Sequence, residues 1–317
     1  MGVKRISIPK ENREKLLVFN RLLRNQTLNK WNPSCPHCNS YHIIKKTDIK
    51  RERKGYAKKY LCRDCNSTFT FDNCFEWTHY PPRVVGDIFH LIAKGESYRD
   101  IIEFIKDRHG VEMDRKTVIN ISRYCTERLE MFRKKIDLKL LHPTVWEIDE
   151  IYLPRGKGKF FKALTVLDID TGYILIIYVS NEIDYESAKK TIELALNNSI
   201  RPPRKFKCEK NAAIIKAAST LLPKKTKIDA KSKKEKFDHL NNIEGQNRKL
   251  RKTLKRGVAY RNKSTLQIRA DIYRYDHNFF WRKQGPPPVY YAGINVPKNL
   301  TRERFLIAVD KFNKLNL

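Results

Sequence analysis

The sequence contains no apolar run long enough to cross a membrane. Its longest runs, such as Tyr173–Val179, are far shorter than the roughly 20 residues that a spanning helix needs. The segment Met1–Arg24 also lacks an apolar block, since charges are scattered through it, so it does not predict a signal peptide. We find no internal repeat. These absences exclude secreted, membrane-spanning and collagen-like classes of protein.

Acidic residues are scarce relative to basic ones. Asp and Glu total 35 against 66 Lys and Arg, which gives a formal net charge of +31. This excess indicates a polyanionic partner, which charge alone leaves open as DNA, RNA or an anionic membrane surface. Hydrophobic residues make up 40% of the chain, enough for a packed core. The length of 317 residues predicts two or three domains.

Four of the seven cysteines form two Cys-x-x-Cys pairs with 23 residues between them. Such pairs present thiolates from tight turns, and two of them complete the tetrahedral ligand set of a structural zinc ion. The predicted zinc ligands are Cys35, Cys38, Cys62 and Cys65. The alternative is a set of reduced, unpaired cysteines. Cys74, Cys125 and Cys208 are interpreted as small core residues.

Helical patterns follow a boundary at Tyr80–Arg83, where two prolines stop regular structure. Ser97 is an expected N-cap, His109-Gly110 ends that helix, and Asp114 caps the next. Helix, short turn and helix is the helix-turn-helix pattern. Its second helix carries residue types that reach bases and phosphates: Arg115, Lys116, Thr117, Asn120 and Arg123. The alternative is a helical packing domain with a solvated basic face.

From residue 143 the pattern changes to strands. Three β-type runs are expected at Val145–Leu153, Phe160–Asp168 and Gly172–Ser180. A helix, a short strand and a helix should follow at Tyr185–Asn197, Lys205–Glu209 and Ala212–Leu221. The lysine-rich run Lys224–Lys236 is interpreted as a flexible basic loop. Further helices are expected at Leu240–Leu254, Ser264–Phe280 and Arg302–Phe312. The fold class is therefore α/β.

Three carboxylates stand out in this second half. Asp149 lies inside the first strand, where alternation places it on the face of Glu147 and Ile151 and opposite Trp146 and Ile148. A buried aspartate in a central strand is costly unless it has a partner such as a metal ion. Glu209 ends a short strand, and Glu244 begins a basic helix. The residues that follow Glu244 on one helical face are Arg248, Arg251, Lys252 and Lys255.

The order of these parts resembles a DDE-type transposase of prokaryotic insertion sequences. The segment Trp146–Glu150 matches the family's first aspartate block, and Asn241–Arg248 matches its final glutamate block. Between residues 209 and 244 lie 34 residues, a spacing typical of one large group of these enzymes, and Arg251 stands where a basic residue is common. The resemblance implies a ribonuclease-H-like core, a mixed sheet flanked by helices. It also implies Mg²⁺ or Mn²⁺ held by Asp149, Glu209 and Glu244.

One position departs from the family pattern. The second acidic residue is normally an aspartate followed by a small residue, whereas this chain has Glu209 and Lys210. Two-metal catalysis needs cations about 3.5–4 Å apart, and a misplacement near 1 Å can cost about 10²-fold in rate. Two hypotheses therefore stay open. One is a transposase that cleaves and transfers DNA strands, and the other is a weakened or inactive transposase-derived DNA-binding protein. A zinc-ribbon protein that binds RNA explains the charge but not the two matching blocks.

The expected organisation follows from these features. Residues 1–30 form a helical segment, 31–80 a zinc ribbon, 83–140 the helix-turn-helix domain, 143–284 the catalytic core, and 285–317 a linker and helix. The resemblance implies double-stranded DNA as partner, both element ends and target, and a homodimer or larger homo-oligomer with no membrane association. It further implies a prokaryotic, cytoplasmic and nucleoid-associated protein.

Overall fold

The computed structural model describes most of the chain, and the termini and several loops lie outside the description. The described residues are 10–24, 35, 37–38, 40, 42–51, 55–71, 75, 78, 80–156, 159–231, 240–255, 260, 262–281 and 285–315. The predicted core cysteine Cys74 lies outside them. Within them, no helix is both long enough and apolar enough to pass through a bilayer.

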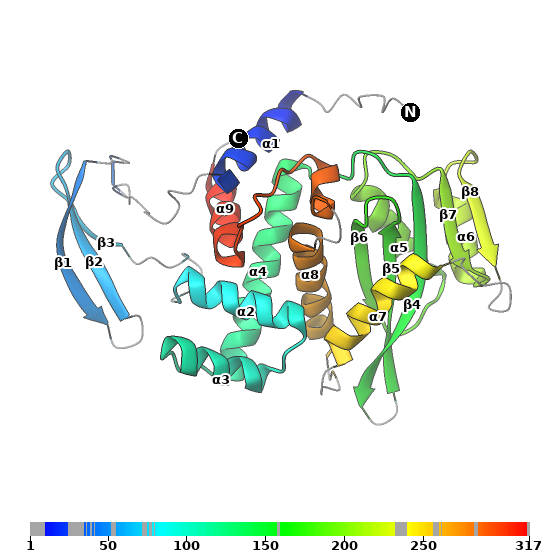
Figure 1. Cartoon of the computed structure of the whole chain (residues 1–317), viewed down its shortest axis with the longest axis horizontal. Coiled ribbons are helices and arrows are strands. Elements are labelled where there is room, and N and C mark those ends of the chain that lie inside the picture. The colour runs from blue at the N-terminus through cyan, green and yellow to red at the C-terminus, as the bar shows by residue number, and fades with distance from the viewer. Residues whose placement is uncertain are drawn as a thin grey trace.

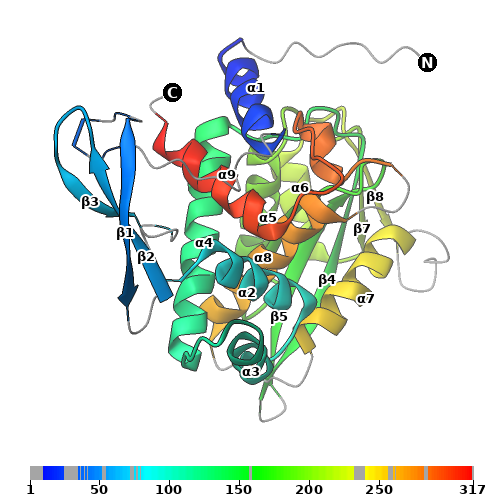
Figure 2. The same ribbon diagram turned by 60° about the vertical axis from the view of Figure 1, so that its left-hand side comes forward.

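A small antiparallel sheet comes early in the chain and stands to one side of the helices in both views (Figures 1 and 2). Its strands are β1 (Ile43–Arg51), β2 (Gly55–Cys62) and β3 (Thr68–Phe71), in the order β1-β2-β3. One cysteine pair lies before β1, and the other lies at the end of β2 and just beyond it.

Helices form the middle of the molecule, next to the small sheet (Figure 1). The N-terminal helix α1 (Lys10–Arg24) is followed by α2 (Pro82–Lys94), α3 (Tyr98–His109) and α4 (Arg115–Ile136). The predicted caps are confirmed, because the Ser97 side chain accepts from Asp100 N and the Asp114 side chain accepts from Thr117 N. Gly110 ends α3 in a left-handed conformation, as expected.

The C-terminal helix α9 (Arg302–Lys314) packs among these early helices. Phe19 of α1 lies 4.3 Å from the Phe132 ring of α4 and 5.6 Å from the Phe312 ring of α9, measured between ring centroids. Residues from both ends of the sequence therefore share one hydrophobic core with α2 and α4. The predicted domain boundaries on either side of residues 83–140 stay predictions.

A five-stranded mixed sheet forms the second half. Its strands are β4 (Val145–Gly156), β5 (Lys159–Asp168), β6 (Ile174–Ser180), β7 (Lys205–Glu209) and β8 (Lys227–Lys231). The order is β6-β5-β4-β7-β8, with β4, β5 and β6 antiparallel and with β7 and β8 parallel to β4. Figure 1 shows α7 crossing one face of this sheet. The predicted α/β arrangement of a mixed sheet flanked by helices is confirmed.

The helices of this half agree closely with their predicted bounds. α5 (Tyr185–Asn197) and α6 (Ala212–Leu221) pack on one face, while α7 (Asn241–Lys255) and α8 (Lys263–Phe280) pack on the other. A short 3-10 helix η3 (Pro288–Ala292), which the sequence does not predict, follows the proline linker.

The interpretation of Lys224–Lys236 as a flexible loop is wrong for part of its length. Residues Lys227–Lys231 form strand β8, which pairs in parallel register with β7 from Lys205↔Lys227 to Glu209↔Lys231. Ile228 and Ala230 pack against the core. The strand depends on pairing with β7, so its own lysine-rich composition gives little sign of it. Residues 232–239 lie outside the description.

Candidate active site

The candidate site lies where strand β4 runs on past its neighbour β7. The parallel pairing between them covers only Val145–Glu147, so among the described strands β4 continues from Ile148 without a partner on that side. Strand β7 ends at Glu209, two residues after Lys207, which is its last residue paired with β4. Helix α7 crosses the same region. Side chains from three separate elements can therefore meet here.

These side chains surround a cavity of about 440 Å³. It is lined by the three predicted carboxylates together with polar, basic and aromatic neighbours: Asp149, Glu209, Glu244, Glu150, Asn247, Arg248, Arg251 and Tyr152. The structure thus brings Asp149, Glu209 and Glu244 to one cavity, although 94 residues lie between the first and the last in the sequence. Two of the predicted basic residues, Arg248 and Arg251, join them.

Asp149 is held by a residue that the sequence analysis does not single out. The Asn247 side chain donates from Nδ2 to Asp149 Oδ2 at 3.0 Å, and both residues are buried, at 1% and 7% exposure. Asn247 comes three residues after Glu244, one helical turn along α7. Its place beside Glu244 in a helix is a usable signal, but its partner becomes visible only when α7 packs on β4.

Glu147 of strand β4 contacts both helix α7 and strand β7. It is fully buried, accepts from the backbone N–H of Ile243 at 2.9 Å, and pairs with Lys207 Nζ at 3.3 Å. One carboxylate on β4 thereby contacts the first turn of α7 and the middle of β7. Because a buried charge is costly without partners, these contacts fix the position of α7, and with it Glu244, relative to Asp149.

A second polar cluster holds α7 against α8. Gln246 Nε2 donates to Tyr273 Oη at 2.6 Å and lies 3.4 Å from His277 Nδ1, while His277 Nε2 lies 2.9 Å from the carbonyl of Gly172. This arrangement suits a neutral imidazole that donates from Nε2 and accepts at Nδ1. Burial lowers the pKa of His277 to about 4, consistent with that neutral form.

The predicted second acidic position is a half-buried glutamate at the end of β7. Asn211 follows it and caps α6 by accepting from Ala213 N and Ile214 N. The backbone of Lys210 donates to Lys231 O at 2.9 Å, which continues the β7–β8 ladder past Glu209. The chain therefore turns at once from the strand into α6, which leaves the Glu209 side chain at the cavity.

The donors around the cavity suit a hard divalent cation. Carboxylate oxygens are the ligands that Mg²⁺ and Mn²⁺ prefer. Among the residues that the structure describes, only the four cysteines form a group of three or more potential ligands within 4.8 Å of one another.

The sequence of this region matches a known family. Residues 144–275 match the family model of IS240-type transposases that is described as a DDE domain. The match covers less than half of the chain. The resemblance to DDE transposases that the sequence predicts is thereby confirmed for this region, and DDE domains usually use divalent metal ions.

Solved structures that match the chain include two viral integrases. One is the catalytic core domain of BIV integrase, at 12% identity and a TM-score of 0.35, covering 46% of this chain and 91% of that one. The other is an intasome of simian T-cell lymphotropic virus, at 12% identity and a TM-score of 0.34, covering 59% of this chain and 70% of that one. No curated protein matches the sequence.

Outside the DDE domain, the four predicted zinc ligands come together. The Sγ atoms of Cys35 and Cys65 lie 3.5 Å apart, as do those of Cys38 and Cys62. Sulfur atoms at the corners of a tetrahedral zinc site, with Zn–S near 2.3 Å, are about 3.8 Å apart. The four thiols therefore fit a structural zinc ion, with no ligand position left over for chemistry.

The predicted DNA-contacting residues of α4 lie apart from the cavity. Arg115, Lys116 and Arg123 are exposed, whereas Thr117 and Asn120 are half-buried. The guanidinium of Arg115 lies 5.4 Å from the centre of the Tyr98 ring on α3. On α7, Lys252 is exposed, and the side chain of Lys255 lies outside the description.

An ion pair between a half-buried glutamate and a buried arginine joins α4 to α8. Glu130 of α4 accepts from Arg274 Nη2 at 2.6 Å and from Tyr275 Oη at 2.7 Å, both on α8, and also pairs with Arg133. Burial alone would raise the pKa of Glu130, but the guanidinium groups of Arg274 and Arg133 lower it to about 2. Arg274 also donates from Nη1 to the carbonyl of Leu175 on β6 at 3.1 Å.

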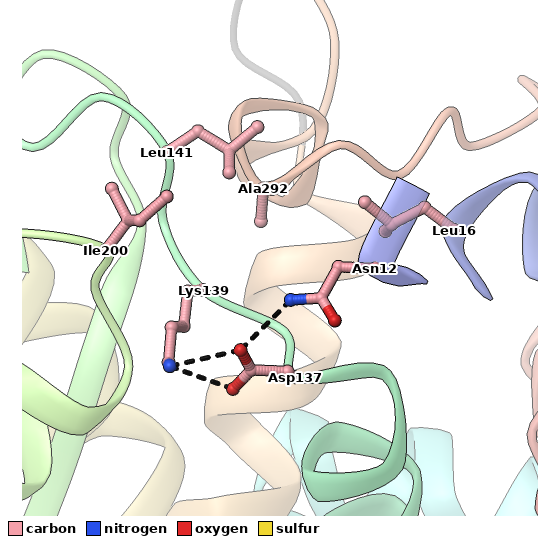
Figure 3. Close-up of a pocket in the computed structure, with 7 residues that line it drawn as sticks. All are labelled: Asn12, Leu16, Asp137, Lys139, Leu141, Ile200 and Ala292. Carbon is pink, nitrogen blue, oxygen red and sulfur yellow. Dashed lines mark hydrogen bonds and ion pairs between the residues drawn. The ribbon is translucent and has the colours of Figure 1, made fainter. Parts of the chain in front are cut away.

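A smaller cavity of about 130 Å³ lies between α1 and the end of α4. Figure 3 shows Asn12 and Lys139 converging on Asp137, with hydrogen-bond and ion-pair distances of 3.1 and 2.9 Å. Asp137 ends α4 with a positive φ of 48°. The residues that line this cavity are not among the predicted site residues, and their contacts anchor α1 on the helical core.

Proposed function

We propose that the chain is a DNA transposase that binds the ends of an insertion sequence and cleaves and joins DNA strands with divalent cations. One observation carries the proposal: Asp149 from β4, Glu209 from β7 and Glu244 from α7 line a single cavity. Each of these carboxylates alone is weak support, because most acidic residues are solvated surface groups. Their meeting inside a DDE domain supports a common chemical role.

In this proposal, the residues of the cavity have different roles. Asp149, Glu209 and Glu244 would hold the cations, and Asn247 would keep the Asp149 carboxylate in place through its 3.0 Å hydrogen bond. The bound cations would supply activation of the attacking water or 3′-hydroxyl and neutralise charge on the phosphodiester. Arg248 and Arg251 line the same cavity and would contact backbone phosphates.

The zinc ribbon and the α3–α4 pair would hold the element ends. Exposed cations on α4 and the charge of +31 support tight binding that weakens steeply as salt rises. Pairing of two ends would require a dimer or a larger assembly.

A second candidate is a DNA-binding protein that has lost catalysis, and Glu209 favours it. The glutamate carries its carboxylate one methylene further from β7 than the family's aspartate would, and Lys210 follows it. If the cations cannot reach their spacing of about 3.5–4 Å, the chain would bind DNA without cutting it.

A cleavage assay separates the two candidates. The substrate is DNA carrying the terminal repeats that flank the gene, with Mg²⁺ or Mn²⁺. The proteins are wild type, Asp149→Asn, Glu209→Asp and the control Glu186→Gln, which changes an exposed residue of α5. We expect cleavage by wild type and the control and none by Asp149→Asn. Cleavage by Glu209→Asp alone would mean an intact scaffold with an inactivated catalyst. Binding without cleavage by every protein would support the second candidate.

A further inference from the structure

The paired ends of β4 and β5 project beyond the other strands of the sheet (Figure 1). Strand β6 pairs with β5 only from Lys162 to Leu167, and β7 pairs with β4 only up to Glu147. Among the described strands, the tip of this hairpin therefore pairs only with itself, from Leu153↔Phe161 onward.

One face of the projecting hairpin is firmly anchored. Ile151, Leu153 and Phe161 are buried, with exposures of 0%, 0% and 2%, and pack in the core beneath α7 and α8. The backbone of Tyr260 donates to the carbonyl of Pro154 at 3.0 Å. The hairpin is thus a fixed support.

The opposite face carries two exposed aromatic rings. Tyr152 is 42% exposed and Phe160 is 49% exposed, and their ring centroids lie 6.4 Å apart at 84°. The Tyr152 hydroxyl donates to Glu150 Oε1 at 2.9 Å, which fixes the direction of the ring. Tyr152 also lines the carboxylate cavity, three residues and about 10 Å along the strand from Asp149.

A basic group lies beside one of the two rings. Lys162 Nζ lies 5.8 Å from the centre of the Tyr152 ring. No Asp or Glu occurs in the sequence from residue 151 to residue 167. Across the cavity stand Arg248 and Arg251. The surface therefore offers flat aromatic rings with cations nearby, next to the carboxylates of the cavity.

Exposed aromatic rings with nearby cations indicate what kind of partner binds here. A nucleic acid strand presents phosphates to the cations and base faces to the rings, and base–aromatic stacking tolerates any sequence. Bases inside a duplex are already stacked on one another, so only unpaired bases can reach the rings. An apolar protein partner would instead have to desolvate the surrounding Lys and Arg side chains.

We propose that Tyr152 and Phe160 form a stacking platform for unpaired bases of the DNA strand whose phosphodiester lies at the carboxylate cavity. The inference deepens the proposed function and rests on it, because it assigns the substrate near the cut as locally unpaired DNA. Partial burial and, after it, the neighbouring carboxylates raise the pKa of Tyr152, so the phenol stays neutral and does not repel phosphates.

The test is equilibrium binding by the full chain without added Mg²⁺ or Mn²⁺, so that it does not depend on cleavage. The probes are a labelled duplex and the same duplex with an unpaired flank that contains 2-aminopurine. Wild type should bind the flanked duplex about tenfold more tightly and quench the 2-aminopurine fluorescence. The double variant Tyr152→Leu/Phe160→Leu should lose both effects and keep its affinity for plain duplex.

Two single variants sharpen the result. Tyr152→Phe keeps the ring and should keep the preference, while Tyr290→Leu, which removes an equally exposed ring on η3, should change nothing. Retention of preference and quenching by the double variant would overturn the inference, as would a wild-type dimer that the double variant dissociates. If wild type binds neither probe, the proposed function fails as well. Cleavage by wild type together with no preference for the flank would overturn the stacking platform alone.

Discussion

The two faces of the five-stranded sheet are built from alternate residues of the same strands, yet they differ in kind. Trp146 and Ile148 of β4 and Phe206 of β7 point toward α5 and α6 and lie in the apolar core. Their neighbours Glu147 and Asp149 point toward α7 and are also buried. One strand therefore carries both a conventional core and a line of buried carboxylates.

The difference shows how a site is kept in a stable domain. The apolar face needs only shape and volume, which tolerate substitution of similar residues. The polar face depends on specific partners, such as the Glu147 contacts with Lys207 and Ile243 and the Asn247 hydrogen bond to Asp149. Stability should reside mainly in the first face and cation binding in the second.

The largest effect should come from the apolar face. Trp146→Ala removes a fully buried side chain and should lower the free energy of unfolding by about 3–5 kcal/mol. Asp149→Asn, three residues away, keeps its volume and should leave the denaturation midpoint nearly unchanged. Urea unfolding of both variants measures the contrast. Equal destabilisation by the two would show that the faces do not divide in this way.

A smaller effect on stability should appear as the pH falls, at His277 in the polar cluster between α7 and α8. The pKa of His277 is about 4 because burial disfavours its charged form, whereas in the unfolded chain it is about 6.5. As the pH falls, the unfolded state therefore takes up the proton first. The contribution of neutral His277 to the free energy of unfolding is complete above pH 6.5 and is lost as the pH falls toward 4. The loss is about 3 kcal/mol.

The measurement is the difference in unfolding free energy between wild type and His277→Gln at several pH values. Burial raises the pKa of Asp271 to about 6, which stabilises the fold as the pH falls from 6 to 4, but this effect is common to both proteins and cancels. A difference that stays constant across pH 7 to 4 would contradict the assignment of a neutral, buried His277.

The smallest of the three effects concerns Asn247. Asn247→Ala removes the hydrogen bond to Asp149 and should weaken Mn²⁺ binding by about 10–100-fold, the usual effect of losing a group that orients a metal ligand. Asn242→Ala, an exposed asparagine of the same helix, is the matched control. Calorimetric titration with Mn²⁺ gives both affinities. Equal affinities for the two variants would remove Asn247 from the metal site.

Much of the fold can be predicted because its signals are local. The bounds of α5, α6 and β7 and the caps at Ser97 and Asp114 follow from periodicity and capping chemistry. Strand β8 could not be predicted, since its five residues become a strand only by pairing with β7.

The candidate site divides in the same manner. Asp149, Glu209 and Glu244 can be predicted from the spacing of their blocks in a resembling family. Asn247 and Tyr152 could not, because one depends on how α7 lies on β4 and the other on where β7 stops beside β4.

The ion pair between Glu130 of α4 and Arg274 of α8 has a geometric consequence. On the proposed function, α4 would bind DNA and the sheet would cut it, and the two would move together because this pair joins them. The number of base pairs between the bound sequence and the cut would then be set by the fold. Lengthening a surface loop elsewhere would leave that number unchanged.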